Sequence, residues 1–201
     1  MGEYRMGEGE GMTDYLTEFL KGFTLTQAEV EQLSSEIDVR TYKQGTILLR
    51  QGDVSKECYF VLQGCLRQFA IDEAGEENTY NFYTEKQTAI NYKSYTQRIP
   101  SEYSIECVED SVLIVGDFIN EDVMFQKYPK LIEITRGFME EDLANIQDNN
   151  ARFISASPQE RYLNLLDTRP NLIDRVPQHQ LASLLGMKPE SLSRIKRRLN
   201  L

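Results

Sequence analysis

Tryptophan is absent from this 201-residue sequence, and histidine, cysteine and proline are scarce, with one, three and six residues respectively. The three cysteines, Cys58, Cys65 and Cys107, have no CxxC spacing, so neither a disulfide framework nor a thiolate metal site is indicated. No apolar run approaches the roughly 20 residues that cross a bilayer, and the N-terminus has no signal-peptide pattern. We therefore expect a cytoplasmic protein with no membrane partner, no metal and no cofactor.

Basic residues are outnumbered, because 22 Lys and Arg against 32 Asp and Glu give a formal charge of -10. As a whole-chain value, this charge argues against binding nucleic acid. The charge is unevenly distributed, however. Residues 157–201 hold eight basic and four acidic side chains, a net charge of +4, and residues 1–156 carry -14. Any contact with DNA is therefore expected at the C-terminal end.

The first two thirds of the sequence change from a helical to a strand pattern. Residues 1–11 predict an irregular leader, and apolar steps of three and four from Thr13 to about Ile37 predict short helices, with Thr26 and Glu29 as a capping box. From about Val39 to Asp117, short runs rich in Ile, Val, Tyr and Phe are separated by glycine turns, including a hairpin turn at 72–75. This pattern predicts an all-β barrel or jelly roll.

A helical period returns from about Glu121 to Phe153 and predicts one long helix. One face carries a seam with Arg at position 136: Ile132, Met139, Leu143, Ile146, Asn150 and Phe153. The helix either packs on its own barrel or pairs with a second copy. We favour a homodimer, because a polar Asn150 within an apolar seam is typical of helix pairs whose register is fixed. Phe138, on another face, is expected to pack against the barrel.

The basic segment begins with a proline break and a helix start, because Ser157, Pro158 and Glu160 are suited to the N-cap, first and third helical positions. The apolar face of that helix is expected to be Tyr162, Leu163, Leu165 and Leu166. Residues 176–199 then contain two short helical patterns joined at Gly186, with the small Ala182 where two helices would cross. This arrangement predicts a helix-turn-helix.

The second of these helices has side chains that suit DNA. Glu190 is able to accept a hydrogen bond from cytosine, and Arg194 is able to donate two to guanine. Ser191 and Ser193 suit bases or phosphates, and the remaining cations, Lys188, Lys196, Arg197 and Arg198, suit phosphates. A basic amphipathic helix alone does not indicate DNA binding, because the charged face of such a helix is commonly just exposed to solvent. The two helices, the glycine turn and the local charge together favour binding to double-stranded DNA.

The order of β-roll, long helix and helix-turn-helix, and the stretch LLGMKPESLSRIKRRL in particular, resembles the Crp/Fnr family of bacterial transcription regulators. The stretch SPQERYLNLL resembles members found in Bacteroidetes. The resemblance implies a homodimer that binds a palindromic promoter site, a β-roll sensor, and RNA polymerase as a partner. It gives Glu190, Ser191 and Arg194 the base-contacting positions, and Gln178 and Gln180 positions that contact the DNA backbone or steady the fold.

Two departures from the family pattern concern the DNA-binding end. Relatives generally continue into a β-hairpin wing, whereas this sequence ends at Leu201, so we expect most of the wing to be missing. Pro189 occupies a position where some relatives have a base-contacting Arg. The operator sequence therefore stays open.

The predicted sensor also departs from the family. Cyclic-nucleotide binders hold the ribose with a Glu and the phosphate with an Arg, at places that fall near 90–92 and at Ser101 here, and neither group is present. Because a buried phosphate needs charge-assisted hydrogen bonds, no cyclic nucleotide is expected. No Cys precedes Cys58, which excludes the iron–sulfur cluster of oxygen-sensing relatives. An unknown small effector is possible in a pocket formed by Phe82, Asn91, Tyr92, Ser101 and Tyr103, although aromatic residues at strand spacing are more often core.

The sequence therefore predicts an α+β fold with three parts: N-terminal helices and a β-roll (1–120), a dimerisation helix (121–156) and a helix-turn-helix domain (157–201). Two rival hypotheses remain. A ligand-binding or interaction module without DNA binding would explain a missing wing. A cupin-like enzyme would share the β-roll, but metal cupins need a histidine cluster and the only histidine is His179. We predict that the protein is not an enzyme.

Overall fold

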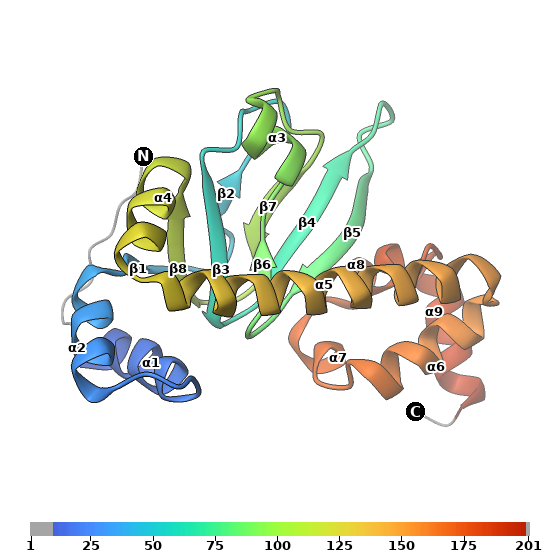
Figure 1. Ribbon diagram of the computed structural model, residues 1–201. Coiled ribbons are helices and arrows are strands. Elements are labelled where there is room, and N and C mark those ends of the chain that lie inside the picture. Colours follow the sequence, from blue (N-terminus) through green and yellow to red (C-terminus); the bar gives the residue numbers. More distant parts are fainter. Residues whose placement is uncertain (1–9, 200–201) are drawn as a thin grey trace.

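The computed structural model describes residues 10–199 and places a β-roll beside one long helix (Figure 1). Two helices precede the roll, α1 (Glu10–Lys21) and α2 (Gln27–Glu36). The predicted capping box is confirmed, because the Thr26 hydroxyl accepts from the Glu29 N–H and the Glu29 carboxylate accepts from the Thr26 N–H. The predicted leader lies mostly outside the described residues. Its last two residues are helical, so the first helix begins earlier than predicted.

Two four-stranded antiparallel sheets form the roll, which confirms the predicted jelly roll. One sheet has the order β1-β8-β3-β6, and the other has the order β2-β7-β4-β5. The strands are β1 (Val39–Tyr42), β2 (Ile47–Leu49), β3 (Glu57–Gln63), β4 (Leu66–Ile71), β5 (Glu77–Tyr83), β6 (Thr88–Ala89), β7 (Ser104–Cys107) and β8 (Ser111–Asp117). Strand β5 is therefore at the edge of its sheet, with β4 as its neighbour.

The turn between β4 and β5 has the predicted form. Gly75 has a φ of 82° and its N–H donates to the Asp72 carbonyl at 3.0 Å, while the Asp72 carboxylate accepts from the N–H groups of Ala74 and Glu76. A glycine adopts this positive φ without the steric cost that other residues meet. The sequence did not predict the short helix α3 (Tyr92–Gln97), which Asn91 caps.

The predicted single helix from Glu121 to Phe153 is wrong, because the structure has two helices there. These are α4 (Phe118–Lys127) and α5 (Pro129–Ser155). Pro129 is the cause, since it has no N–H for a helix that arrives from α4 and it restricts the backbone of Tyr128, which takes φ -127° and ψ 78°. The prediction for Phe138 is confirmed: its ring centroid lies 5.1 Å from that of Phe60 on β3.

The C-terminal helices are α6 (Pro158–Thr168), α7 (Leu172–Arg175), α8 (Gln178–Leu184) and α9 (Pro189–Arg198). The predicted start of α6 is confirmed, with Ser157 as the N-cap of a capping box and Pro158 in the first turn. Of the predicted apolar face, Tyr162 and Leu165 are buried, but Leu163 is 41 % exposed. Helix α7 was not predicted.

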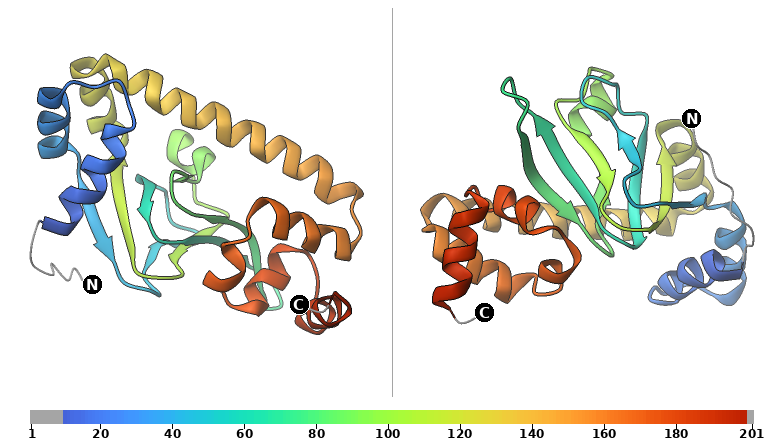
Figure 2. Two further views of the ribbon diagram at one scale, coloured as in Figure 1. Left: turned by 90° about the horizontal axis from the view of Figure 1, so that it is seen from below. Right: turned by 180° about the vertical axis from the view of Figure 1, so that it is seen from behind.

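Helix α5 runs along the length of the molecule, and the roll lies beside the middle of this helix (Figure 1). Helices α1 and α2 lie near the start of α5, and the C-terminal helices lie near its end, next to β5. Two further views show the same arrangement (Figure 2). The C-terminal helices contact the long helix through Arg161 and Phe153, and they share a buried apolar cluster with Phe82 of the roll.

Candidate nucleic-acid interface

Helices α8 and α9 form the predicted helix-turn-helix. Leu181 and Ala182 of α8 and Leu192 and Ile195 of α9 are buried in a common core. Ala182 is fully buried, which agrees with a small residue at the crossing of the two helices. Gly186 in the turn has a φ of 65°, which favours glycine. The buried faces fix the orientation of α9, and its other face is left to solvent.

The outward face of α9 carries most of the predicted DNA contacts. Its exposed members, together with the residue that precedes the helix, are Lys188, Glu190, Ser193, Arg194, Arg197 and Arg198. Ser191 is half-buried. Three cations, Lys196, Arg197 and Arg198, lie in the last turn, where they complement the negative end of the helix dipole. This face therefore offers hydrogen-bonding groups for bases and positive charge for phosphates.

Gln178 and Gln180 differ in their surroundings, although both begin α8. Gln178 is exposed and its amide donates to the Ser193 hydroxyl at 2.9 Å, so it joins α8 to α9. Gln180 is half-buried, and its buried Oε1 has no hydrogen-bond partner among the described residues. Gln178 is thus placed to orient the predicted base-contacting helix, whereas Gln180 is only partly accessible to a DNA backbone.

The predicted dimer seam is exposed to solvent in the single chain. No residue of α5 is buried. The exposed apolar side chains of the seam are Ile132, Met139, Leu143, Ile146 and Phe153, and Asn150 is exposed beside them. The Phe153 ring lies 3.9 Å from the guanidinium carbon of Arg161 on α6, so it also contacts its own C-terminal helices.

The structure does not bring all five predicted pocket residues together. Asn91 and Ser101 do meet, because the Asn91 amide donates to the Ser101 hydroxyl at 2.7 Å. Tyr92 is 59 % exposed, and the Tyr103 ring packs edge-on against Tyr80. Phe82 is fully buried in the core that contains the C-terminal helices. The five side chains therefore do not line one common cavity.

The predicted place of the phosphate-binding Arg is closed by internal hydrogen bonds. The Ser101 hydroxyl donates to the Tyr103 carbonyl at 2.6 Å, and it accepts from Asn91. Ser94 of α3 is also buried, and it bonds the Ile99 carbonyl and the Ser55 N–H. Arg98 has a φ of 56°, and its guanidinium carbon lies 5.7 Å from the Tyr95 ring. The Asn91, Ser94 and Ser101 side chains therefore form hydrogen bonds within the protein.

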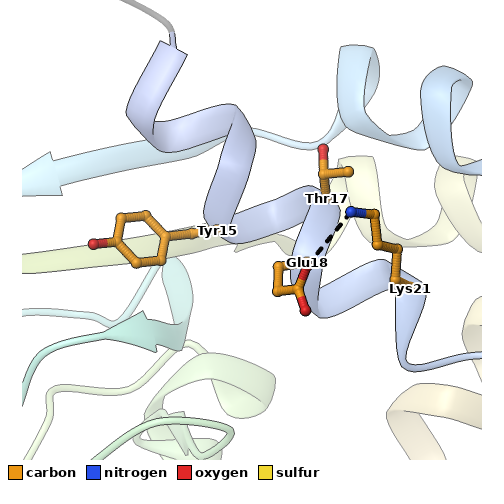
Figure 3. A pocket seen from close by; sticks show the side chains of 4 residues that line it. All are labelled: Tyr15, Thr17, Glu18 and Lys21. Carbon is orange, nitrogen blue, oxygen red and sulfur yellow. Dashed lines mark hydrogen bonds and ion pairs between the residues drawn. The ribbon is translucent and has the colours of Figure 1, made fainter.

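Among the surface hollows of the described residues, two lie elsewhere. One, of about 440 Å³, is lined by Tyr15, Thr17, Glu18 and Lys21 of α1, where Lys21 and Glu18 form an ion pair of 3.5 Å (Figure 3). The other, of about 570 Å³, lies along β2 and the start of β3. Neither is lined by any of the predicted pocket residues.

Sequence reasoning missed the residues that attach the helix-turn-helix to the roll. Arg175 of α7 pairs with Glu85 and Glu109, and Arg169 donates from Nη2 to the Phe82 carbonyl at 2.8 Å. Burial lowers the pKa of Arg169. The sequence signal available was an arginine at the end of α6 and another at the end of α7, two of the eight basic residues of the tail. Their partners are 66 to 90 residues away and cannot be found from local pattern.

The structure thus combines a double-sheet roll, a long helix and a C-terminal helix-turn-helix in one chain, the arrangement that resembles Crp/Fnr-type regulators. Residues 39–123 match the family model of the cyclic nucleotide-binding domain. The chain is also 22 % identical over 140 residues to the anaerobic regulatory protein of Haemophilus influenzae, a match that covers 69 % of this chain and 54 % of the relative. The chain thus spans about half the length of that curated relative.

Several solved structures share the fold. The c-di-GMP responsive global regulator CLP of Xanthomonas campestris matches with a TM-score of 0.66 and 17 % identity over 85 % of this chain and 90 % of that chain. FixK2 of Bradyrhizobium japonicum matches with a TM-score of 0.67 and 12 % identity over 82 % and 84 %. The catabolite activator protein of Thermus thermophilus matches with a TM-score of 0.50 and 23 % identity over 88 % and 84 %.

These comparisons confirm the resemblance predicted from the sequence: the chain has the domain and the fold of a Crp/Fnr-type regulator. The curated relative is named a regulatory protein, and CLP is described as a global regulator. Within residues 10–199, no helix is long and apolar enough to cross a membrane.

Proposed function

We propose that this chain is a cytoplasmic DNA-binding transcriptional regulator that binds a palindromic promoter site as a homodimer, with RNA polymerase as a further partner. The observation that carries the proposal is the exposed polar and basic face of α9, held on a buried helix-turn-helix core in a chain of net charge -10. The negative charge of residues 1–156 would repel DNA, whereas the positive charge of residues 157–201 would attract it.

The dimer follows from α5. An apolar seam along a helix of 27 residues, with side chains such as Leu143 that are 56 % exposed, is a surface that a single soluble chain rarely leaves uncovered. A second copy that packs its own seam there would bury both, and the polar Asn150 would set the register. Two copies related by a two-fold axis present two α9 helices, which suits half-sites about one DNA turn apart.

Two substitutions separate base recognition from general attraction. Arg194→Ala is expected to cost about 1–3 kcal/mol on the preferred operator and to relax the preference for one base pair. Arg197→Ala is expected to weaken binding to all sequences alike and to reduce the salt dependence by about one unit of slope. Fluorescence anisotropy with operator and scrambled duplexes at several salt concentrations measures both effects. Arg50→Gln, at an exposed arginine of the roll, is the control.

The outcome decides between the proposed regulator and its rivals. Equal losses for both variants on every DNA would mean that α9 does not contact bases as proposed. A wild-type protein that binds no DNA in a salt-sensitive manner would overturn the regulator proposal and favour the ligand-binding or interaction module.

We also propose that the roll binds no cyclic nucleotide. Ser101 and Asn91 form a hydrogen bond with each other at the place where a phosphate would need a guanidinium. Isothermal titration with cyclic AMP and cyclic GMP is expected to give no binding heat at millimolar ligand. Saturable binding of either nucleotide would contradict this part of the proposal.

A further inference from the structure

The face of the roll that carries β5 is not a free surface, because the helix-turn-helix domain packs on it. Three roll residues, Cys65, Phe82 and Val108, belong to the same buried cluster as nine residues of the C-terminal segment 157–199. Cys65 and Phe82 are fully buried. The sensor and the DNA-binding part therefore share one apolar core, and neither can move without opening it.

The free edge of β5 is completed by a side chain of α8. The Ser183 hydroxyl accepts from the Thr79 N–H at 2.8 Å and donates to the Glu77 carbonyl at 3.3 Å. It thereby satisfies two backbone groups that a neighbouring strand would otherwise bond. Helix α8 lies beside β5 in the overall view as well (Figure 1). The first helix of the helix-turn-helix is thus fixed against the sensor by direct hydrogen bonds.

Arg175 adds an ionic contact at the same junction. It donates to both carboxylate oxygens of Glu85, at 2.8 and 2.9 Å, and to Glu109, and its side chain is only 23 % exposed. Burial acts to raise the pKa of Glu85, but the hydrogen bonds from Arg175 and from the Gly64 N–H lower it overall. Glu85 follows β5 and Glu109 follows β7, so one guanidinium joins two turns of the roll to α7. A bidentate pair of this kind also fixes orientation.

The link through the long helix is made by fewer interactions. Only Ala156 and Ser157 separate α5 from α6. Arg161 bridges this joint by donating to the Phe153 carbonyl and to the Leu185 carbonyl, each at 3.2 Å. The contacts with the roll are more numerous and more buried than this bridge, so they dominate the position of α9 relative to α5.

We propose that this docking interface, formed by Arg175, Glu85, Glu109, Ser183 and the edge of β5, positions the two α9 helices of the dimer. The inference rests on the proposed function. The base-contacting candidates Glu190 and Arg194 are exposed and outside the interface, so weakening the interface leaves their chemistry intact and alters only where they lie. Arg175 is thus a positioning residue, and its loss is expected to alter the preferred half-site spacing, not the preferred bases.

Two measurements on the full chain test this proposal. The first needs no DNA. Amide hydrogen exchange at Thr79, followed by NMR, is expected to become about tenfold faster in Arg175→Gln. The variant loses the charged hydrogen bonds that hold α7 on the roll, and α7 directly precedes the helix α8 that covers the Thr79 N–H. Arg175→Lys keeps the charge but not the two-pronged geometry, and is expected to be intermediate. Arg50→Gln serves as the matched control and leaves the exchange unchanged. Should Arg175→Gln prevent folding, Glu85→Gln weakens the same pair while preserving its shape.

The second measurement uses the operator that the wild-type protein selects from random DNA, rebuilt as a series with different spacers between the half-sites. The wild type is expected to favour one spacer, and Arg175→Gln to bind several spacers within about threefold of one another with unchanged base preference. If Arg175→Gln left the exchange at Thr79 unchanged, the claim that Arg175 stabilises the docking interface would be wrong, whether or not the protein binds DNA. Faster exchange with an unchanged spacer optimum would overturn the positioning role alone. A wild type that binds no DNA would overturn the proposed function and the positioning role, while Thr79 exchange still reports on the interface.

Discussion

Gly64, in the turn between β3 and β4, is predicted to be the least replaceable glycine of the roll. Its φ is 113°, and a Cβ at this position would lie 2.3 Å from the Ser111 Oγ and 2.7 Å from the Ser111 Cα. An unfavourable backbone conformation costs about 1–3 kcal/mol, and overpacking a tight contact costs about 1–3 kcal/mol more. Gly64→Ala is therefore expected to lower the free energy of unfolding by about 2–6 kcal/mol.

Gly75→Ala is the matched control, because its φ is 82° but nothing lies within 4 Å of the added Cβ. Its free energy of unfolding is expected to fall only by the cost of the unfavourable backbone conformation, about 1–3 kcal/mol. Urea unfolding followed by far-UV circular dichroism gives both values, which is convenient because the sequence has no tryptophan.

The double variant Gly64→Ala/Ser111→Gly removes the clash with the serine side chain but leaves the clash with the backbone at position 111, so it is expected to recover only part of the loss. Equal losses for Gly64→Ala and Gly75→Ala would refute the close approach of the two turns. Full recovery in the double variant would show that only the serine side chain had mattered.

Three further predictions concern the dimer, a helix cap and the buried thiols. Leu143→Asp is expected to leave the chain folded, since this side chain is exposed to solvent in the single chain. The variant is expected to sediment as a monomer in sedimentation velocity, and a dimer that persists would contradict the proposed dimer contact along α5. Ser157→Ala removes the N-cap of α6 and is expected to lower the free energy of unfolding by about 1 kcal/mol in urea, with Ser155→Ala, outside the cap, changing less. Burial raises the pKa of the Cys65 and Cys107 thiols from 9.0 to about 12, so the folded state keeps protons that the unfolded state releases. The free energy of unfolding is therefore expected to fall as pH rises from 9 toward 12, and Cys65→Ala to make that fall shallower.

Local patterns in the sequence predicted the elements that depend on local physics. The capping boxes at Thr26 and Ser157, the glycine turns at Gly75 and Gly186 and the buried face of α9 need only neighbouring residues to form. The break at Pro129 also depends on local physics, but it was not predicted. The effect of this proline on the preceding residue was sufficient to predict the break between α4 and α5, but the continuous helical period obscured it.

Interactions across long sequence separations were beyond prediction. The alternation around Phe82 correctly indicates a strand, yet it does not tell which element covers that face, and the helix-turn-helix occupies it instead of a ligand. Arg169 likewise marks the end of α6 in the sequence, whereas its bond to the Phe82 carbonyl depends on the packing of two distant segments. The candidate base-contacting residues were predictable because they lie on one short helix, and the interface that positions them was not.

The way in which Ser183 completes the edge of β5 has a consequence for the behaviour of the protein at high concentration. An uncovered edge strand presents unpaired N–H and C=O groups that recruit strands from other molecules, and aggregation follows when apolar side chains accompany them. If the helix-turn-helix left the roll, the Thr79 N–H and the Glu77 carbonyl would be uncovered together with Phe82. The helix-turn-helix thus also protects the roll from self-association, so a roll expressed without residues 157–201 is expected to precipitate where the full chain stays in solution.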